Sequence, residues 1–374
     1  MKRNVLVIAG LAVLSTSAHA TKARVEALGQ DSVRGSEYIS DSRNIFRNPA
    51  VLNQTKNYLV TEWGTSVNGQ NDSAAAPRAE GGFFREMGSF NYGVYLGNNE
   101  ASKGRTGAVG IYMPQTNGLD LFLSGDMGLQ WGARLHYANS KDEATSPTFE
   151  KKNTSFGLGL GAVMGEAEVY ADLTLSDKST GAVAAGDQFK TKPSFLVGGS
   201  YKWSGNTFFA NYEGTKVEVT GNAGGATLGD TKTSAIVVGA GRIHEINPTA
   251  RIITDASVKI GSTQTTAGKV KTNTLPVTLG FEADATSWLV LRGSVAQNVI
   301  LNSSKSVTGK TTTNANSTGV NAGATLNFGK LKVDGTIGTT TAINGTSTTT
   351  PAGTNTGVLS LSNLMTRVGV SYWF

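Results

Sequence analysis

The last residues of the chain alternate between two kinds of side chain. Every second position from Leu364 to Phe374 is apolar or Thr, and the positions between them include Arg367 and Ser371. Successive side chains of a β-strand point to opposite faces, so this pattern predicts a strand with one face against an apolar medium. An aromatic residue at the very end suits the boundary between the apolar and polar layers of a bilayer.

The same period of two recurs from Tyr58 onward and is most regular after residue 118. Segments such as 129–137, 250–260 and 275–283 hold one apolar and one polar phase over about ten residues, the length that a tilted strand needs to cross a hydrocarbon layer. Strands in soluble sandwiches are mostly shorter, about five or six residues. The pattern therefore favours strands that span a membrane.

The connections between these segments alternate between tight turns and long polar loops. The predicted tight turns are Gly125-Asp126, Gly165-Glu166, Ser204-Gly205, Ile246-Asn247, Asp284-Ala285 and Gly329-Lys330. The predicted long loops are 140–152, 176–191, 220–231, 261–271, 301–316 and 342–358. Short turns at one end and long loops at the other are typical of membrane barrels, with the turns on the periplasmic side and the loops on the extracellular side.

Ending on Phe after alternating apolar positions resembles the terminal strand of bacterial outer-membrane β-barrel proteins, porins among them. In that group this pattern serves the barrel-assembly machinery, so the resemblance assigns an assembly signal to Val368, Val370, Tyr372 and Phe374. We expect an all-β fold, a transmembrane antiparallel up-and-down barrel with both termini periplasmic. Counting back by hairpins, 118–124 is the thirteenth strand from the end. One or three strands must precede it, which predicts 14 to 16 strands.

The start of the chain predicts export. Lys2 and Arg3 precede the apolar run 5–14, and Ala18-His19-Ala20 has the small residues of a signal-peptidase site. We therefore expect a signal peptide at 1–20, a periplasmic or plug segment at 21–56, and a barrel at 57–374 in the outer membrane. With no cysteine to form disulfides and no basic run, the composition argues against a disulfide scaffold and against nucleic acid as a partner.

Residues 21–56 do not alternate, and they contain Asn48-Pro49-Ala50. This tripeptide resembles the Asn-Pro-Ala segment of the long-chain fatty acid transporter family of outer-membrane proteins. In that family an N-terminal hatch inside a fourteen-stranded barrel gates the passage of hydrophobic compounds. Asn-Pro also starts ordinary turns, so the segment is either a hatch or a periplasmic strap, and the tripeptide alone favours the strap.

The sequence favours neither catalysis nor a metal or other cofactor. Gly157 to Ala162 matches a dinucleotide-binding fingerprint, but these glycines keep the phase of a strand and are followed by another strand instead of a helix. Small residues facing a crowded lumen explain them better. After residue 20 the chain has two histidines, His136 and His244, and neither has an acidic residue in its own strand that could orient it.

Charged residues in the polar phase are expected to face the inside of the barrel, because Lys or Arg at the lipid midplane costs about 2–4 kcal/mol. The predicted pore-lining residues are Arg134, His136, Glu168, Asp172, Lys202, Glu213, Arg242, Arg251, Asp255, Lys259, Glu282, Arg292, Lys332, Asp334 and Arg367. A mixed lining with a small cationic excess predicts a weak preference for anions. An alternative is that these charges pair with one another and plug the barrel.

From the sequence we therefore expect a porin, a water-filled channel for small hydrophilic solutes or ions. Two alternatives stay open: a gated transporter of hydrophobic compounds with a hatch at Asn48, Pro49 and Ala50, and a structural or adhesive barrel whose Thr-rich loops matter most. The expected partners are outer-membrane lipid and lipopolysaccharide, the barrel-assembly machinery, and a second copy of the chain.

Overall fold

The computed structural model describes residues 21–64, 79–98, 115, 117–145, 148–180, 188–220, 222–223, 226–227, 230–306, 309–312, 318–338 and 367–374. The predicted signal peptide at 1–20 and the predicted loop at 342–358 lie outside these ranges. None of the helices in the described part of the chain is long and apolar enough to span a membrane.

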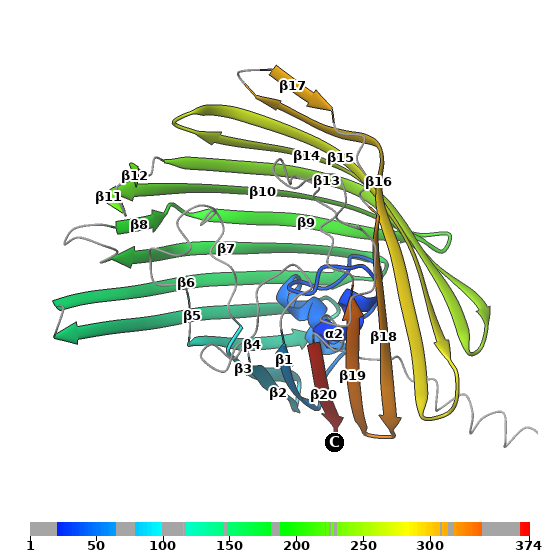
Figure 1. Cartoon of the computed structure of the whole chain (residues 1–374). Coiled ribbons are helices and arrows are strands. Elements are labelled where there is room, and N and C mark those ends of the chain that lie inside the picture. Colours follow the sequence, from blue (N-terminus) through cyan, green and yellow to red (C-terminus); the bar gives the residue numbers. More distant parts are fainter. Residues whose placement is uncertain are drawn as a thin grey trace, which may run out of the picture.

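The chain forms a closed antiparallel β-barrel of 16 strands (Figure 1). The barrel strands are β1 (Tyr58–Gly64), β2 (Glu80–Met87), β3 (Phe90–Leu96), β4 (Gly118–Asp126), β5 (Gln130–Thr145), β6 (Thr148–Met164), β7 (Ala167–Thr180), β9 (Ser194–Trp203), β10 (Asn206–Thr220), β13 (Thr231–Asn247), β14 (Ala250–Thr265), β15 (Gly268–Asp284), β16 (Leu289–Ser306), β18 (Gly319–Phe328), β19 (Leu331–Gly338) and β20 (Arg367–Trp373). Each of them pairs with its neighbours along the chain.

Four short strands extend this wall or lie beside it. β8 (Gln188–Thr191) pairs with β7 and β10 beyond the end of β9, and β17 (Gly309–Thr312) pairs with β16. β11 (Asn222–Ala223) and β12 (Ala226–Thr227) pair only with each other.

The first and last strands close the barrel. β1 pairs with β2 on one side and with β20 on the other, in a register that sets Tyr58 opposite Trp373. Closure leaves no unpaired edge, which is the arrangement that satisfies every strand inside a bilayer. The predicted strand at 118–124 is β4, and three strands precede it, so the count of 14 to 16 resolves to 16.

The two faces of the wall differ as the alternation predicts. Large apolar side chains on the outside are exposed, among them Leu121, Leu135, Val238, Ile260, Leu279 and Val295. In β20, Arg367, Gly369 and Ser371 are buried on the inner face, so Val368 and Val370 face outward. Phe374 is also exposed and stacks on Phe83, with ring centroids 5.6 Å apart. Its assembly role stays a prediction.

The predicted long loops that fall within the described residues contain paired strands instead. Residues 140–145 and 148–152 continue the β5–β6 ladder, in which Lys141 lies opposite Lys152, and 261–271 continue the β14–β15 ladder up to Thr265 and Gly268. Within 176–191 the end of β7 pairs with β8, within 301–316 the end of β16 pairs with β17, and within 220–231 β11 pairs with β12. The prediction failed there because Thr, Ser and Lys can extend an antiparallel ladder into water, where no apolar face is needed. The hairpins at this end are therefore long; we call it the long-hairpin end, and the opposite one the short-turn end.

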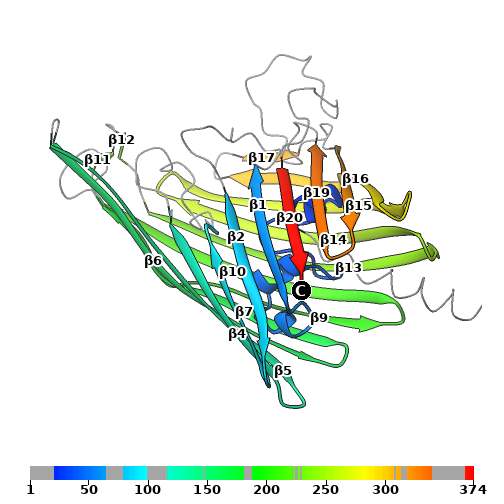
Figure 2. The same ribbon diagram turned by 90° about the horizontal axis from the view of Figure 1, so that it is seen from below.

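Residues 21–56, which we call the plug, lie inside the barrel (Figures 1 and 2). They contain the helix α2 (Lys22–Ala27) and two 3-10 helices, η1 (Ser42–Phe46) and η2 (Pro49–Asn53). Most of these helical residues are buried. Their partners are side chains on the inner face of the wall, as the next section describes.

Candidate functional site: the plug and the inner wall

The helix α2 docks on β16, β18, β19 and β20. The hydroxyl of Ser294 donates to the carbonyl of Ala27 at 2.9 Å, and the hydroxyl of Thr336 donates to the carbonyl of Ala23 at 2.5 Å. A Cβ added to Gly369 would lie 2.3 Å from Thr21, so a glycine there lets the helix approach the wall. Ser294 thus satisfies the carbonyl of Ala27, at the end of the helix, which has no partner within the helix.

Arg24 ties α2 to a cluster of buried charges. Its Nε donates to Glu282 Oε2 at 2.8 Å, and its Nη1 donates to Asp41 Oδ2 at 2.9 Å. Glu282 also binds Arg292, with Nε 3.0 Å from Oε2, and Arg251. Arg24, Asp41, Glu282 and Arg292 are each at most 3% exposed, so each charge depends on its partners.

Arg43 makes a second buried attachment of the plug to the wall. Its Nη1 lies 3.0 Å from Glu80 Oε1 and 3.0 Å from Tyr95 Oη, and its Nη2 donates to Asn98 Oδ1 at 3.1 Å. The guanidinium also lies over the Phe46 ring, 3.9 Å from its centroid. Glu80 lies on β2, so this arginine connects η1 to the start of the barrel.

Two ionisable groups of the plug have pKa values that are shifted toward neutral pH. Burial raises the pKa of the Asp41 carboxyl to about 7, although Arg24 and the backbone N–H of Arg43 act in the opposite direction. Burial, with the nearby Arg43 guanidinium, lowers the pKa of Lys22 to about 8 despite the Glu80 carboxylate beside it. Both groups therefore titrate close to neutral pH.

The predicted hatch residues pack against wall glycines. Asn48 caps η2 through its Oδ1, which accepts from the N–H of Ala50, and its Nδ2 donates to Glu168 at 3.3 Å. A Cβ at Gly161 would lie 1.9 Å from Asn48 Oδ1. One at Gly132 would lie 2.3 Å from the Pro49 carbonyl carbon.

These contacts decide between the two interpretations of the segment. The strap outside the barrel, which the tripeptide alone favours, is wrong, because Asn48, Pro49 and Ala50 lie against the inner wall. The expectation that the fingerprint-like glycines face a crowded lumen agrees with the structure.

An apolar cluster fills the space between η1, η2 and the start of the wall. Ile45, Phe46 and Leu52 from the plug pack with buried wall residues, which are Tyr58, Val60, Phe84, Tyr95 and Phe122. Phe46 meets Tyr95 and Phe122 edge to face, with centroids 4.9 and 5.5 Å apart. Trp373 of β20 packs on this cluster, so its side chain lies on the inner face of that strand.

Most of the predicted pore-lining residues contact the plug or one another. Arg367 lies 3.3 Å from Glu26 Oε2, Tyr38 Oη donates to Asp255 at 2.6 Å, and Arg34 lies 3.4 Å from Glu213. Asp334 accepts from Thr21 and binds Arg292, and Lys332 lies over the Trp373 ring. Lys202 and Lys259 also occupy inner-face positions, and both are exposed.

Arg242 was predicted to line the pore, and the structure places it on the outer face. The register sets Arg242 opposite Asn206 and Thr254, in the phase of the exposed Val238. A Cβ on Gly205 would lie 3.7 Å from its guanidinium, at the short-turn end. The prediction failed because it assumed that every charge faces inward, whereas an arginine at the rim reaches water without crossing the apolar belt.

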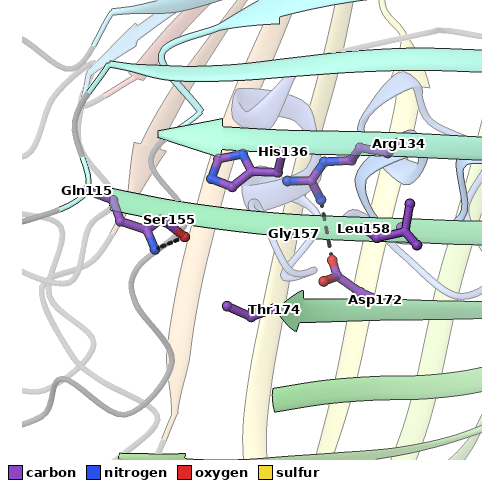
Figure 3. A pocket seen from close by; sticks show the side chains of 9 residues that line it. Gln115, Arg134, His136, Ser155, Gly157, Leu158, Asp172 and Thr174 are labelled. Atoms are coloured by element: carbon purple, nitrogen blue, oxygen red, sulfur yellow. Dashed lines mark hydrogen bonds and ion pairs between the residues drawn. The ribbon is translucent and has the colours of Figure 1, made fainter. Parts of the chain in front are cut away.

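A polar cavity lies on the side of η2 that faces the long-hairpin end (Figure 3). It is lined by Gln115, Arg134, His136, Ser155, Gly157, Leu158, Gly159, Asp172 and Thr174. Asp120 organises it, since its Oδ1 lies 2.8 Å from both Arg134 Nε and His136 Nδ1. Arg134 also reaches Asp172 at 3.3 Å.

Sequence reasoning missed Asp120 as the orienting partner of His136. It searched for an acidic residue in the same strand, but Asp120 comes from β4 and His136 from β5, directly opposite in the ladder. The alternation could have found it, because Asp120 shares its phase with the buried Phe122.

Comparisons with known proteins show limited likeness. No protein-family model matches the chain, and no curated protein matches it either. The FrpB iron transporter of Neisseria meningitidis is 10% identical, with 76% of this chain and 54% of that one covered and a TM-score of 0.44. The chain thus spans about half the length of FrpB.

Two further solved structures match over nearly their whole length. The toluene transporter TbuX of Ralstonia pickettii is 11% identical, with 96% of this chain and 99% of that one covered and a TM-score of 0.38. A mutant of the Rh. blastica porin is 13% identical, with 85% and 99% covered and a TM-score of 0.34. Likenesses of this size identify no family, so function is argued below from the chain's own residues.

Proposed function

We propose that this protein is a transport channel of the outer membrane, that it carries small hydrophilic solutes, and that its own N-terminal plug closes it. The observation that carries the proposal is the set of buried contacts by which the plug binds the inner wall. In an aqueous porin with an unobstructed lumen, these charged wall residues would contact water and would not be buried against a separate segment.

The attachments are distributed around the barrel. Arg24 binds β15, Arg43 binds β2, Glu26 binds β20 and Asn48 binds β7. A segment held from several sides crosses the lumen, which supports a closed state and a gate that must shift for solute to pass. The ion pairs are non-covalent, so such a shift needs no chemical step.

The chemistry beside the plug favours hydrophilic cargo. The buried cavity beside the plug is lined by charged and amide groups, among them Arg134 and His136, and a solute that passes when the plug shifts would contact these groups. The apolar cluster around Phe46 is enclosed between plug and wall. A hydrophobic compound would have to desolvate the polar groups before reaching that cluster, which is unfavourable.

An open porin is the second candidate, and one observation favours it. Lys259 on the inner face is exposed and Glu213 is partially exposed, which would suit a water-filled space beside the plug. The weak anion preference and the homo-oligomer belong to this candidate as well and stay predictions. A purely adhesive barrel is the third candidate, and it differs from the other two because it predicts no conductance.

The test is to lock the plug onto the wall and to delete it. The chain has no cysteine, so the pair Pro49→Cys and Gly159→Cys can be crosslinked without side reactions. A Cβ at residue 159 would lie 3.5 Å from Pro49 Cγ, so the side chains at these two positions would be in contact, which a crosslink requires. Single-channel recording in planar bilayers would compare oxidised, reduced, single-cysteine and 21–56-deleted proteins.

The proposal expects a severalfold conductance increase on deletion, and openings in the reduced double variant that vanish on oxidation. The two single-cysteine variants should behave like the wild type. Equal conductance in wild type and in all variants would indicate an open porin and overturn the gate. If none of them conducted, the channel function would be ruled out.

A further inference from the structure

Exposed lysines form a band on the outer face of the barrel, toward the long-hairpin end. The lysine band comprises Lys178 on β7, Lys190 on β8, Lys216 on β10, Lys232 on β13, Lys269 and Lys271 on β15, and Lys305 on β16. The expectation that charges keep to the inner face is therefore wrong at this level of the wall.

The outward direction follows from the residues next to each lysine. Ser179 and Phe189 beside Lys178 and Lys190 are buried, and so is Val217 beside Lys216. In β13, Lys232 shares the phase of Ile236, which is 46% exposed. The band is thus the continuation of the apolar outer face.

Its height corresponds to the edge of a bilayer. Lys232 lies four residues beyond Ile236 in the same strand. At about 3.3 Å per residue and a tilt of about 40°, this places its Cα roughly 10 Å above the last large apolar side chain of that strand. Phosphate groups of lipids lie at this level, and the lysine side chains are long enough to reach them.

The band contains three pairs of lysines, and the two lysines of each pair lie directly opposite each other in the ladder. Lys178 lies opposite Lys190, Lys216 opposite Lys232, and Lys271 opposite Lys305. Side chains in such positions start about 5 Å apart, and like charges there are destabilising. Glu218 lies beside the first two pairs, whereas the Lys271–Lys305 pair has no carboxylate of the described residues next to it and calls for an anion that is not part of the chain.

The chain compensates part of this charge. Glu218 lies 3.1 Å from Lys216 and 3.0 Å from Lys192, and it is opposite Lys190 in the β8–β10 ladder, while the exposed Asp230 lies two residues before Lys232. The other six lysines of the band form no ion pair within the described residues. Their ammonium groups therefore present unneutralised donors to the surroundings.

We propose that the lysine band binds the phosphates of anionic lipid headgroups in the membrane leaflet around the barrel. A phosphate between two opposed ammonium groups accepts hydrogen bonds from both and turns their repulsion into a bridge. Continuity with the apolar outer face selects a membrane lipid over a soluble anion. The inference rests on the proposed membrane location, but not on the gate.

The test uses lipids of defined charge. Wild type, the triple variant Lys232→Gln, Lys271→Gln, Lys305→Gln, and a control variant Lys202→Gln, Lys259→Gln, Lys330→Gln would be refolded into phosphatidylcholine vesicles with and without phosphatidylglycerol. The control removes the same charge from exposed lysines outside the band. Spin-labelled lipids measure the preference of the protein for the anionic over the zwitterionic lipid, and urea unfolding measures stability.

We expect wild type and control to prefer the anionic lipid severalfold, and the triple variant to lose that preference. About 1 M salt should abolish it in all proteins, since the Debye length is then about 3 Å. In zwitterionic vesicles the triple variant should be more stable than wild type, because the repulsion in two opposed pairs, Lys216–Lys232 and Lys271–Lys305, is relieved, and phosphatidylglycerol should reverse that order.

Equal lipid preference in all three proteins would overturn the proposal. So would stabilisation of wild type by inorganic phosphate in zwitterionic vesicles to the same extent as by the anionic lipid, which would indicate a site for soluble anions. The single-channel recordings described above do not involve the band. A negative result in the lipid experiment therefore does not contradict the plugged channel, and a negative result in the recordings does not contradict lipid binding by the band.

Discussion

Arg24 of the plug and Glu282 of β15 bind each other 258 residues apart in the sequence, with Nε 2.8 Å from Oε2. Both side chains are at most 3% exposed. Removing one member of a buried ion pair leaves the other charge uncompensated, which costs about 3–5 kcal/mol. The attachment of the plug should therefore be sensitive to substitution at this pair.

We predict that Arg24→Met loosens the plug while the barrel still folds, because Glu282 keeps Arg251 and Arg292 and Asp41 loses its cationic partner. Single-channel recording should show more frequent openings than in wild type. The matched control is Arg34→Met, whose partially exposed pair with Glu213 is worth about 0–1 kcal/mol. If both variants open equally often, the Arg24 cluster does not hold the plug.

Wall glycines give a second test. Gly161→Ala should displace η2, because the new Cβ would lie 1.9 Å from Asn48 Oδ1. Gly280→Ala is the control, since its Cβ would meet ordinary contacts at 3.4 Å or more. Protease cleavage within residues 21–56 should become faster in the first variant and stay at the wild-type rate in the second. Unchanged cleavage of Gly161→Ala would mean that η2 does not depend on this contact.

Charge reversal on the inner wall should separate exposed from buried positions. Lys259 is exposed, so Lys259→Glu should fold normally and shift the reversal potential toward cations in protein lacking residues 21–56. Arg292 is buried between Glu282 and Asp334, so Arg292→Glu would bring three carboxylates together and should reduce the yield of folded barrel sharply. Normal folding of Arg292→Glu would contradict the assignment of this cluster.

Deleting Phe374 tests the end of the chain. Phe374 stacks on Phe83 of β2 on the outer face, and its N–H donates to the carbonyl of Asn57 at 3.2 Å. We expect less folded protein in the outer membrane, measured by heat-modifiable mobility in gels. Phe374→Trp, which keeps an aromatic ring at the interface, should restore it. Wild-type levels after deletion would remove Phe374 from the assembly signal.

The sequence by itself determined the wall. Alternation in a strand is a local property, because each backbone step turns the side chain to the other face, so residues such as Leu279 and Glu282 could be assigned to faces without knowing their neighbours. The even strand count followed from the same pattern and from the direction of the last strand. Arg242 shows the limit, since a charge at the rim can reach water from the outer face.

Only the tertiary structure decided where residues 21–56 lie. That segment has no period that points to a face, and its place depends on contacts such as Arg24 with Glu282, Asn48 with Gly161 and Glu26 with Arg367. Each joins residues more than a hundred positions apart, so the local sequence around either residue does not show the contact. The lysine band also needed the register, because Lys271 and Lys305 oppose each other only through ladder pairing.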